Sequence, residues 1–141
     1  MTSMTGGCAC GAKRFTAEIA DDVKPYLCHC RMCQRATGSV SIAFTQIDGG
    51  KVRWLSEPDW YDSSSIARRP FCSACGTSLG FVYKDPDRVM MDLTVASFDD
   101  PLRFRPVAHS GAESLHEAWV DTSGLPRHIT RPEIEARTRA A

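Results

Sequence analysis

Polar and apolar residues alternate along several short stretches of the chain. The clearest run covers residues 13–19, and a less regular one covers residues 39–47. Because successive side chains of a strand point to opposite faces, alternation with a period of two is typical of a half-buried strand. Further strands are expected at residues 52–55, 60–66, 79–83 and 89–95, with turn sequences such as Asp48-Gly49-Gly50 and Asp85-Pro86-Asp87 between them. The pattern predicts a mainly β fold of short antiparallel strands.

Helical signals are few. Thr130 and Glu133 are spaced as in a capping box, which predicts a short helix at residues 132–139. A single helical turn is also expected at residues 32–36, ended by Gly38. The chain has 141 residues, 43% of them hydrophobic, so we expect one domain over residues 1–141. Its core should span about residues 7–126, and residues 127–141 should form a C-terminal tail that carries the short helix.

Charge and hydropathy argue against two broad classes of protein. Lys and Arg together number 17, as do Asp and Glu, so the chain has no general attraction for nucleic acid. No segment approaches the roughly 20 apolar residues that a membrane span needs, and residues 1–11 lack the features of a signal peptide. We therefore expect a cytoplasmic protein with no nucleic-acid or membrane partner, and the sequence leaves its oligomeric state open.

Four of the seven cysteines form two pairs with the spacing of metal ligands. Cys8 and Cys10 precede an expected strand, and residues two apart in extended backbone face the same side. Cys72 and Cys75 form a C-x-x-C turn whose thiolates converge, and Gly76 can adopt the positive φ that such turns often need. An odd cysteine count in a reducing compartment argues against a pure disulfide framework. These four cysteines are predicted to hold one structural zinc ion.

The remaining cysteines lie together in Cys28-His29-Cys30-Arg31-Met32-Cys33. Three protein ligands on a tetrahedral zinc ion leave its fourth position for water or substrate, which is typical of catalytic rather than structural zinc. Cys28, Cys30 and Cys33 are therefore the predicted catalytic zinc site. Two zinc ions per chain are the expected cofactors.

Several alternatives stay open at this point. The cysteines could hold one zinc ion beside a redox-active or free thiol group, hold an iron–sulfur cluster, or be buried without a metal. His29 could supply a fourth ligand, but on extended backbone its side chain points away from both neighbouring sulfurs. The other histidines are interpreted as ordinary polar residues: His109, His116 and His128.

Three motifs carry a resemblance to a known family. They are Gly7-Cys8-Ala9-Cys10-Gly11, then Cys28-His29-Cys30-Arg31-Met32-Cys33-Gln34-Arg35 with Thr37-Gly38-Ser39, and Arg69-Pro70-Phe71-Cys72-Ser73-Ala74-Cys75-Gly76-Thr77-Ser78-Leu79. With these residues the chain resembles the glutathione-dependent formaldehyde-activating enzyme family, also called the centromere protein V family. The resemblance implies a β-tent fold with zinc knuckles, a structural zinc ion on Cys8, Cys10, Cys72 and Cys75, and a catalytic zinc ion on Cys28, Cys30 and Cys33. It also implies a carbon–sulfur lyase similar to S-(hydroxymethyl)glutathione synthase, with glutathione and formaldehyde as partners.

The predicted chemistry is the reaction of a thiol with a small aldehyde. A thiol at the open zinc position would lose its proton and attack the aldehyde, with Thr37, Ser39 or backbone amides as donors to the developing alkoxide. Glutathione carries two carboxylates, for which the candidate partners are Arg31, Arg35, Arg68 and Arg69, although arginines are commonly solvated. Two other classes stay open: a β-tent zinc module that binds protein partners without catalysis, and a redox or metal-storage protein.

Overall fold

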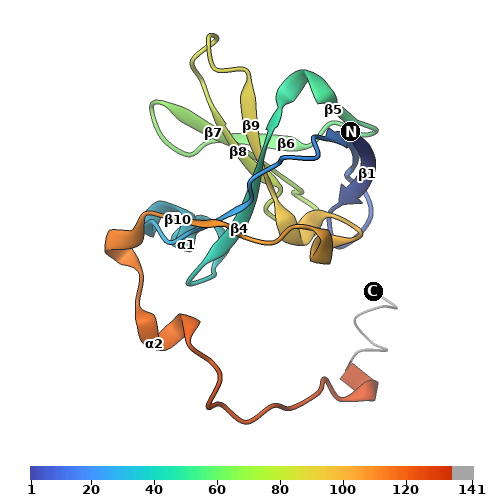
Figure 1. Cartoon of the computed structure of the whole chain (residues 1–141). Coiled ribbons are helices and arrows are strands. Elements are labelled where there is room, and N and C mark those ends of the chain that lie inside the picture. Colours follow the sequence, from blue (N-terminus) through green and yellow to red (C-terminus); the bar gives the residue numbers. More distant parts are fainter. Residues whose placement is uncertain (135–141) are drawn as a thin grey trace.

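The computed structural model describes residues 1–134 of the chain and contains two β-sheets (Figure 1). The smaller sheet has three strands in the order β1-β2-β5, and each neighbouring pair is antiparallel. Its strands are β1 (Thr2–Gly7), β2 (Arg14–Ile19) and β5 (Val52–Trp54).

The larger sheet has seven strands in the order β10-β3-β4-β9-β8-β7-β6. Neighbouring strands are antiparallel, except that β10 runs parallel to β3. In chain order the strands are β3 (Tyr26–Cys28), β4 (Ile42–Asp48), β6 (Asp59–Asp62), β7 (Ala67–Phe71), β8 (Gly80–Tyr83), β9 (Met90–Thr94) and β10 (Ala108–Ser110). The pairing of β10 with β3 brings a late part of the chain against the strand that leads into the three-cysteine motif.

Helical elements are short in the part of the chain that the structure describes. Helix α1 (Arg31–Thr37) begins after Cys30, whose sulfur accepts a hydrogen bond from the Cys33 N–H, and ends at Gly38 with a φ of 71°. The other elements are α2 (Glu117–Val120) and the 3-10 turns η1 (Gly49–Lys51), η2 (Val95–Ser97), η3 (Pro101–Arg103) and η4 (Ala112–Ser114).

The predicted fold class, a mainly β fold of β-tent type with short antiparallel strands and little helix, is confirmed. The strand expected at residues 60–66 is wrong beyond Asp62, because the N–H groups of Ser63 and Ser64 turn back to the Ala67 carbonyl. The sequence pattern does not indicate β1, β3, β7 or β10, two of which have only three residues. The helix expected at residues 132–139 lies mostly outside the described residues, of which 132–134 are helical.

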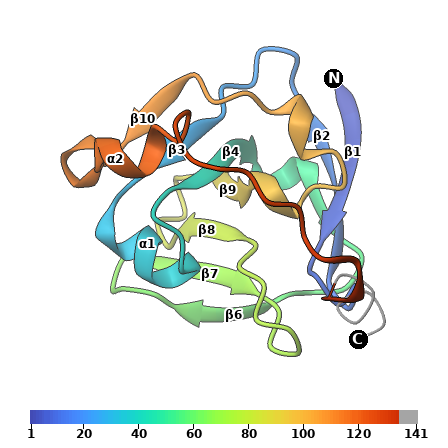
Figure 2. The same cartoon turned by 90° about the horizontal axis from the view of Figure 1, so that it is seen from below.

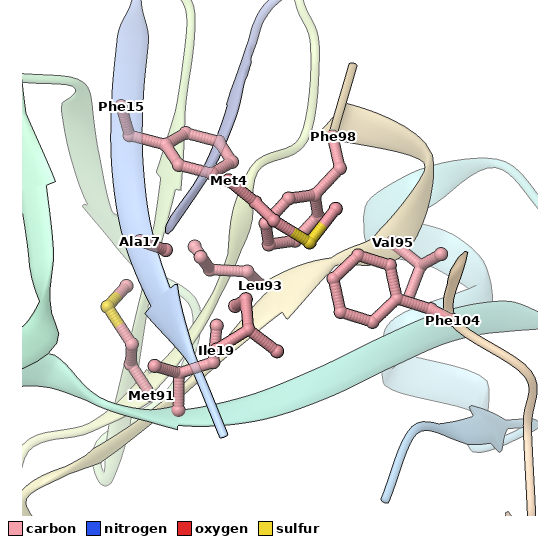
Figure 3. Packing of buried hydrophobic residues seen from close by; sticks show 10 residues of the cluster. Met4, Phe15, Ala17, Ile19, Met91, Leu93, Val95, Phe98 and Phe104 are labelled. Carbon is pink, nitrogen blue, oxygen red and sulfur yellow. The ribbon is translucent and has the colours of Figure 1, made fainter. Parts of the chain in front are cut away.

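The main hydrophobic core lies between the two sheets (Figure 3). Strands β2 and β9 each turn alternate side chains toward it, which is the physical reason for the alternation along β2. Phe15 is fully buried, and its ring packs edge-on against Trp54 and Phe98, with centroid distances of 5.3 and 5.1 Å. The buried members are Met4, Phe15, Ala17, Ile19, Ile47, Met91, Leu93, Val95, Phe98 and Phe104.

The other face of the seven-stranded sheet carries α1 and a second set of side chains. Phe44 of β4 clusters there with Cys28 and Cys33, whereas Ile47 of the same strand belongs to the main core. Figures 1 and 2 both place α1 and β10 toward the same side of the molecule. The three-cysteine motif therefore lies on the face of the larger sheet that is turned away from the main core.

An ion pair ties the three-stranded sheet to the segment after β9. Arg14 Nη1 donates to Asp99 Oδ1 at 2.9 Å, and the Asp99 N–H donates to the Thr5 carbonyl at 2.9 Å. Arg14, followed by the Thr5 hydroxyl, lowers the pKa of Asp99 to about 2. Because both side chains of the ion pair are partly exposed, the pair contributes more to geometry than to stability.

Beyond η4 the chain leaves the sheets. Residues 116–134 are all exposed, and Figure 1 shows this segment running apart from the rest of the molecule. Within residues 1–134, no helix combines the length and the apolar character needed to cross a membrane.

Leu93→Ala should destabilise the protein strongly, whereas Leu102→Ala should not. Leu93 is fully buried between the sheets, and Leu102 is 88% exposed. A buried Leu→Ala change typically costs about 2–5 kcal/mol, and an exposed change usually stays within about 0.5 kcal/mol. Denaturant unfolding of the two variants measures the difference, and equal losses would contradict this assignment of the core.

Candidate metal centres

The first group of cysteines joins the two sheets. Cys8 and Cys10 follow β1, Cys72 and Cys75 follow β7, and their four sulfurs lie within 4.8 Å of one another. The Sγ atom of Cys10 is 3.6 Å from that of Cys8 and 3.8 Å from that of Cys72. Sulfurs bound about 2.3 Å from a tetrahedral zinc ion would be about 3.8 Å apart. The spacing of this group is therefore compatible with one zinc ion.

Each of the two cysteine pairs is shaped by a glycine that follows it. Gly11 and Gly76 both have a φ of +80°, a region that favours glycine. The Gly76 N–H donates to the Cys72 carbonyl at 2.7 Å, and the Gly11 N–H donates to the Cys8 carbonyl at 3.1 Å. The positive φ expected at Gly76 is therefore confirmed.

Thr77 connects the two knuckles directly. Its Oγ1 accepts a hydrogen bond from the Ala9 N–H at 3.0 Å and lies 3.1 Å from Cys75 Sγ. Beneath them, Cys8 and Cys72 are buried in a small cluster with Leu79. One side of the four-sulfur group is thus held by packing and the other by hydrogen bonds.

The second group consists of Cys28 at the end of β3, Cys30 at the N-cap of α1 and Cys33 in its first turn. Their sulfurs also lie within 4.8 Å of one another, with 3.5 Å between those of Cys28 and Cys30. Among residues 1–134, no fourth His, Cys, Asp or Glu joins this group. A metal ion held here would keep an open coordination position.

His29 does not take part in this group. It is fully buried, its Nδ1 lies 2.7 Å from Ser41 Oγ, and its Nε2 lies 2.8 Å from His109 Nδ1. Both ring nitrogens are thus occupied on the side away from the sulfurs, which agrees with the alternation expected for extended backbone. The hypothesis that His29 completes the ligand set finds no support in this arrangement.

A cavity of about 410 Å³ opens beside the three sulfurs. Its wall includes Cys28, Cys30 and Cys33. The larger sheet adds Tyr26, Arg69, Phe81 and Asp92, and the loop between β8 and β9 adds Arg88. Gly111 closes one side so tightly that a Cβ atom there would lie 2.7 Å from the Cys30 nitrogen. A small molecule in this cavity would lie directly against the open side of the cysteine group.

Arg69 is the candidate arginine that the structure brings to the second group. It is 2% exposed, and its Nη2 donates to Cys33 Sγ at 3.3 Å. The guanidinium lies 4.9 Å from the centroid of the Phe81 ring, and its Nε and Nη1 have no hydrogen-bond partner. A buried guanidinium remains charged and needs an anion nearby. The sulfur that Arg69 contacts can supply that charge as a thiolate.

The structure does not bring the other sequence candidates to the cavity. These are Arg31, Arg35, Arg68, Thr37 and Ser39. Arg68 lies over the Trp60 ring at 4.2 Å, and the Thr37 hydroxyl donates to the Cys33 carbonyl at 2.7 Å. Thr37 and Ser39 were candidates because they follow the motif closely, but their hydroxyls form local hydrogen bonds with backbone carbonyls.

Tyr26 and Asp92 line the cavity but were not among the candidates predicted from the sequence. The available signal was weak but present, because Asp92 is a charged residue inside an expected strand, between the buried residues Met91 and Leu93. In a strand, such a residue must point to the opposite face from its neighbours. This face of β9 lines the cavity.

Charge is distributed unequally within the second group. The hydrogen bond with Cys28, and after it the contact with Arg69, lowers the pKa of the Cys33 thiol to about 5. The same contact with Cys33, followed by burial, raises the pKa of Cys28. Arg69 is therefore placed to act as the counter-charge of a thiolate at Cys33. Thiolates are soft ligands, so this donor set suits zinc.

The fold and the cysteines define a class: small, mainly β proteins with one closed four-cysteine group and one open three-cysteine group beside a cavity. A family model described as glutathione-dependent formaldehyde-activating enzyme matches residues 3–114, and the chain belongs to that family. The matched segment contains all seven cysteines.

Two individual proteins are similar to this chain. A protein of Schizosaccharomyces pombe, named an uncharacterized lyase, is 36% identical over 83 residues, which cover 59% of this chain and 60% of that protein. A solved structure of a Rhodobacter sphaeroides protein, a structural genomics target, has a TM-score of 0.60 and 20% identity, and the match covers 76% of this chain and all of that one. At that identity the second likeness concerns the fold alone.

Cys72→Ala should lower the melting temperature of zinc-purified protein much more than Cys30→Ala. Cys72 is fully buried in the group that joins the sheets, whereas Cys30 is half-buried and belongs to a local motif. Loss of a structural metal ligand removes binding free energy that stabilises the fold. Thermal unfolding of both variants is the measurement. Equal shifts would mean that both groups are structural or that their roles are reversed.

Proposed function

We propose that this protein is a zinc-dependent, carbon–sulfur lyase-like enzyme that acts on the thiol adduct of a small aldehyde, as S-(hydroxymethyl)glutathione synthase does. The observation that carries the proposal is the group of three cysteine sulfurs, without a fourth ligand in the described residues, on the wall of a cavity of about 410 Å³. The family description, which names glutathione and formaldehyde, and the lyase name of the fission-yeast relative both support this class of reaction.

Two zinc ions per chain are part of the proposal. Cys8, Cys10, Cys72 and Cys75 would hold a structural ion, and Cys28, Cys30 and Cys33 a catalytic one. The catalytic ion would supply a Lewis acid that favours the thiolate form of a sulfur ligand at its open position. Because three thiolates carry more negative charge than one Zn²⁺ can neutralise, the site favours exchange of thiol ligands over activation of water.

The protein itself supplies charge compensation and positioning. Arg69 places a fixed positive charge beside Cys33, which offsets the excess negative charge of the group. Arg88 lies at the cavity wall, 4.4 Å above the Tyr83 ring and 3.8 Å from the Asp85 carboxylate. Because this ion pair is exposed and weak, the guanidinium can exchange Asp85 for a substrate carboxylate, such as those of glutathione. The cavity holds the two reactants against each other, so that much of the entropic cost of their encounter is met by binding.

Reduced protein loaded with zinc should contain about two zinc ions per chain, and Cys30→Ala should contain about one. The four-cysteine group remains intact in this variant, whereas the three-cysteine group loses a ligand. Elemental analysis measures the number of zinc ions per chain in both proteins. A value of one in the native protein, unchanged in the variant, would exclude zinc at the three-cysteine group.

The native protein should accelerate the exchange between glutathione, formaldehyde and their adduct, and Cys30→Ala should not. The uncatalysed reaction is spontaneous, so NMR exchange spectroscopy must show a rate above that of the protein-free mixture. Native protein that keeps both zinc ions but gives no acceleration would rule out this substrate pair. If, in addition, no thiol changes the spectrum of cobalt bound at the three-cysteine group, a zinc module without catalysis would replace the enzyme.

A further inference from the structure

Asp92 is a buried carboxyl group in the wall of the same cavity. It lies in the middle of β9, is 4% exposed, and is paired across the sheet with Gln46 of β4 and Phe81 of β8. The strand turns its neighbours Met91 and Leu93 into the main core, so the carboxyl group points to the face that carries the cysteine group. Charged carboxylates are rarely buried unless they have a polar partner or a functional role.

Asp92 has a hydrogen-bond donor but no ion-pair partner. Tyr26 Oη donates to Asp92 Oδ1 at 2.9 Å, and within residues 1–134 no basic nitrogen lies within 4 Å of the carboxylate. The charged or titratable groups that share the cavity are Tyr26 on β3, Arg69 on β7, Tyr83 on β8, Arg88 after β8, and the three cysteines. Burial, opposed by the Tyr26 hydrogen bond, raises the pKa of Asp92 to about 6.

The proposed reaction transfers one proton from the thiol to the aldehyde oxygen, so no proton is released or taken up overall. The thiol loses its S–H proton before its sulfur attacks, and the aldehyde oxygen needs a proton after the attack. One group in the cavity can therefore take the proton from the thiol and return it to the oxygen, provided that its pKa lies near the working pH.

We propose that Asp92 is this proton-carrying catalytic residue, and the inference rests on the function proposed above. Ionised Asp92 takes the proton of the incoming thiol. The sulfur electron pair then forms the bond to the carbonyl carbon while the C=O π electrons move to oxygen, and protonated Asp92 gives its proton to that oxygen. In the reverse direction Asp92 takes the hydroxyl proton as the carbon–sulfur bond breaks, so the same residue serves both directions.

The other groups of the cavity are poorly suited to this task. A guanidinium group has hydrogen-bond donors but no acceptor, so Arg69 and Arg88 do not serve as bases, and burial raises the pKa of Tyr26. The three cysteines are the expected metal ligands. His29 is bonded to Ser41 and His109 and is not among the residues that line the cavity. Asp92 supplies the carboxyl group among the residues that line the cavity, and this group can exchange a proton with a bound molecule.

The test uses zinc-loaded Asp92→Asn, with Asp62→Asn as the matched acid-to-amide control, because Asp62 is an exposed residue paired with Lys84. In native protein and control, the exchange rate above background should rise with pH through about 6, as the Asp92 carboxyl ionises. The exchange rate above background should be at least about tenfold lower for Asp92→Asn than for native protein, and it should not show this rise with pH. It should keep two zinc ions and should melt at pH 8 no lower than native protein, because its amide carries no buried charge.

A second measurement does not depend on turnover. Glutathione that binds as thiolate gives up one proton, and its negative charge should raise the proton affinity of nearby Asp92. At pH 6, close to the pKa of Asp92, native protein should therefore release clearly less than one proton per glutathione, and Asp92→Asn about one. Calorimetric titration in buffers of different ionisation enthalpy counts these protons. Equal release from both proteins, or the absence of thiol binding, would overturn the role of Asp92. A difference in proton release without any acceleration of exchange would instead reject the proposed reaction and keep the proton-accepting role.

The variant Tyr26→Phe distinguishes a catalytic role of Asp92 from a loss of activity through misfolding. Its hydrogen bond lowers the pKa of Asp92, so its removal should move the rise in exchange rate to higher pH while the carboxyl group remains in place. A purely structural role of Asp92 would leave the midpoint of this pH profile unchanged in Tyr26→Phe, and that result would also overturn the proposal.

Discussion

The convergence of Cys8, Cys10, Cys72 and Cys75 on one point is the constraint on which the rest of the structure depends. These sulfurs belong to two different sheets, and they can approach one another only when β1 and β7 end at the same place. That requirement fixes the end of β7, and Arg69 lies on this strand, three positions before Cys72. The hydrogen bond from Arg69 to Cys33 thus links the closed cysteine group to the open one through a single short strand.

Buried charge distinguishes the cavity from the main core. The core between the sheets is formed by apolar side chains, whereas the opposite face of the larger sheet buries Arg69 and Asp92 within the same cavity wall. Each of these side chains is costly to bury without compensation, and two nitrogens of Arg69 have no hydrogen-bond partner. The sulfur of Cys33 faces the guanidinium, and the Tyr26 hydroxyl donates to the carboxylate. A chain that needed only stability would place apolar residues there.

The sequence was informative where local spacing determines the chemistry. The division of the cysteines into groups of four and three follows from short motifs, since residues two or three apart can meet at one metal ion only in a few backbone geometries. Arg69 and Asp92 could not be assigned to the cavity in this way, because their neighbourhood depends on which strands pair. Thr37 and Ser39, in contrast, are close to the motif in sequence but do not line the cavity. Their hydroxyl groups donate hydrogen bonds to local backbone carbonyls instead. The three-residue strands β3 and β10 are too short for any periodicity to show.

The two cysteine groups differ in the length of chain that separates their members, and this sets an order of assembly. Cys28, Cys30 and Cys33 lie within six consecutive residues, so these donors are all available as soon as that short segment has been synthesised. Cys10 and Cys72 are 62 positions apart, and closing a loop of that length costs about 2 kcal/mol more in chain entropy than closing one of five. The local group can therefore capture an ion on a nascent chain. We expect the distant group to close later, together with the long-range strand pairing that limits the folding rate of β proteins.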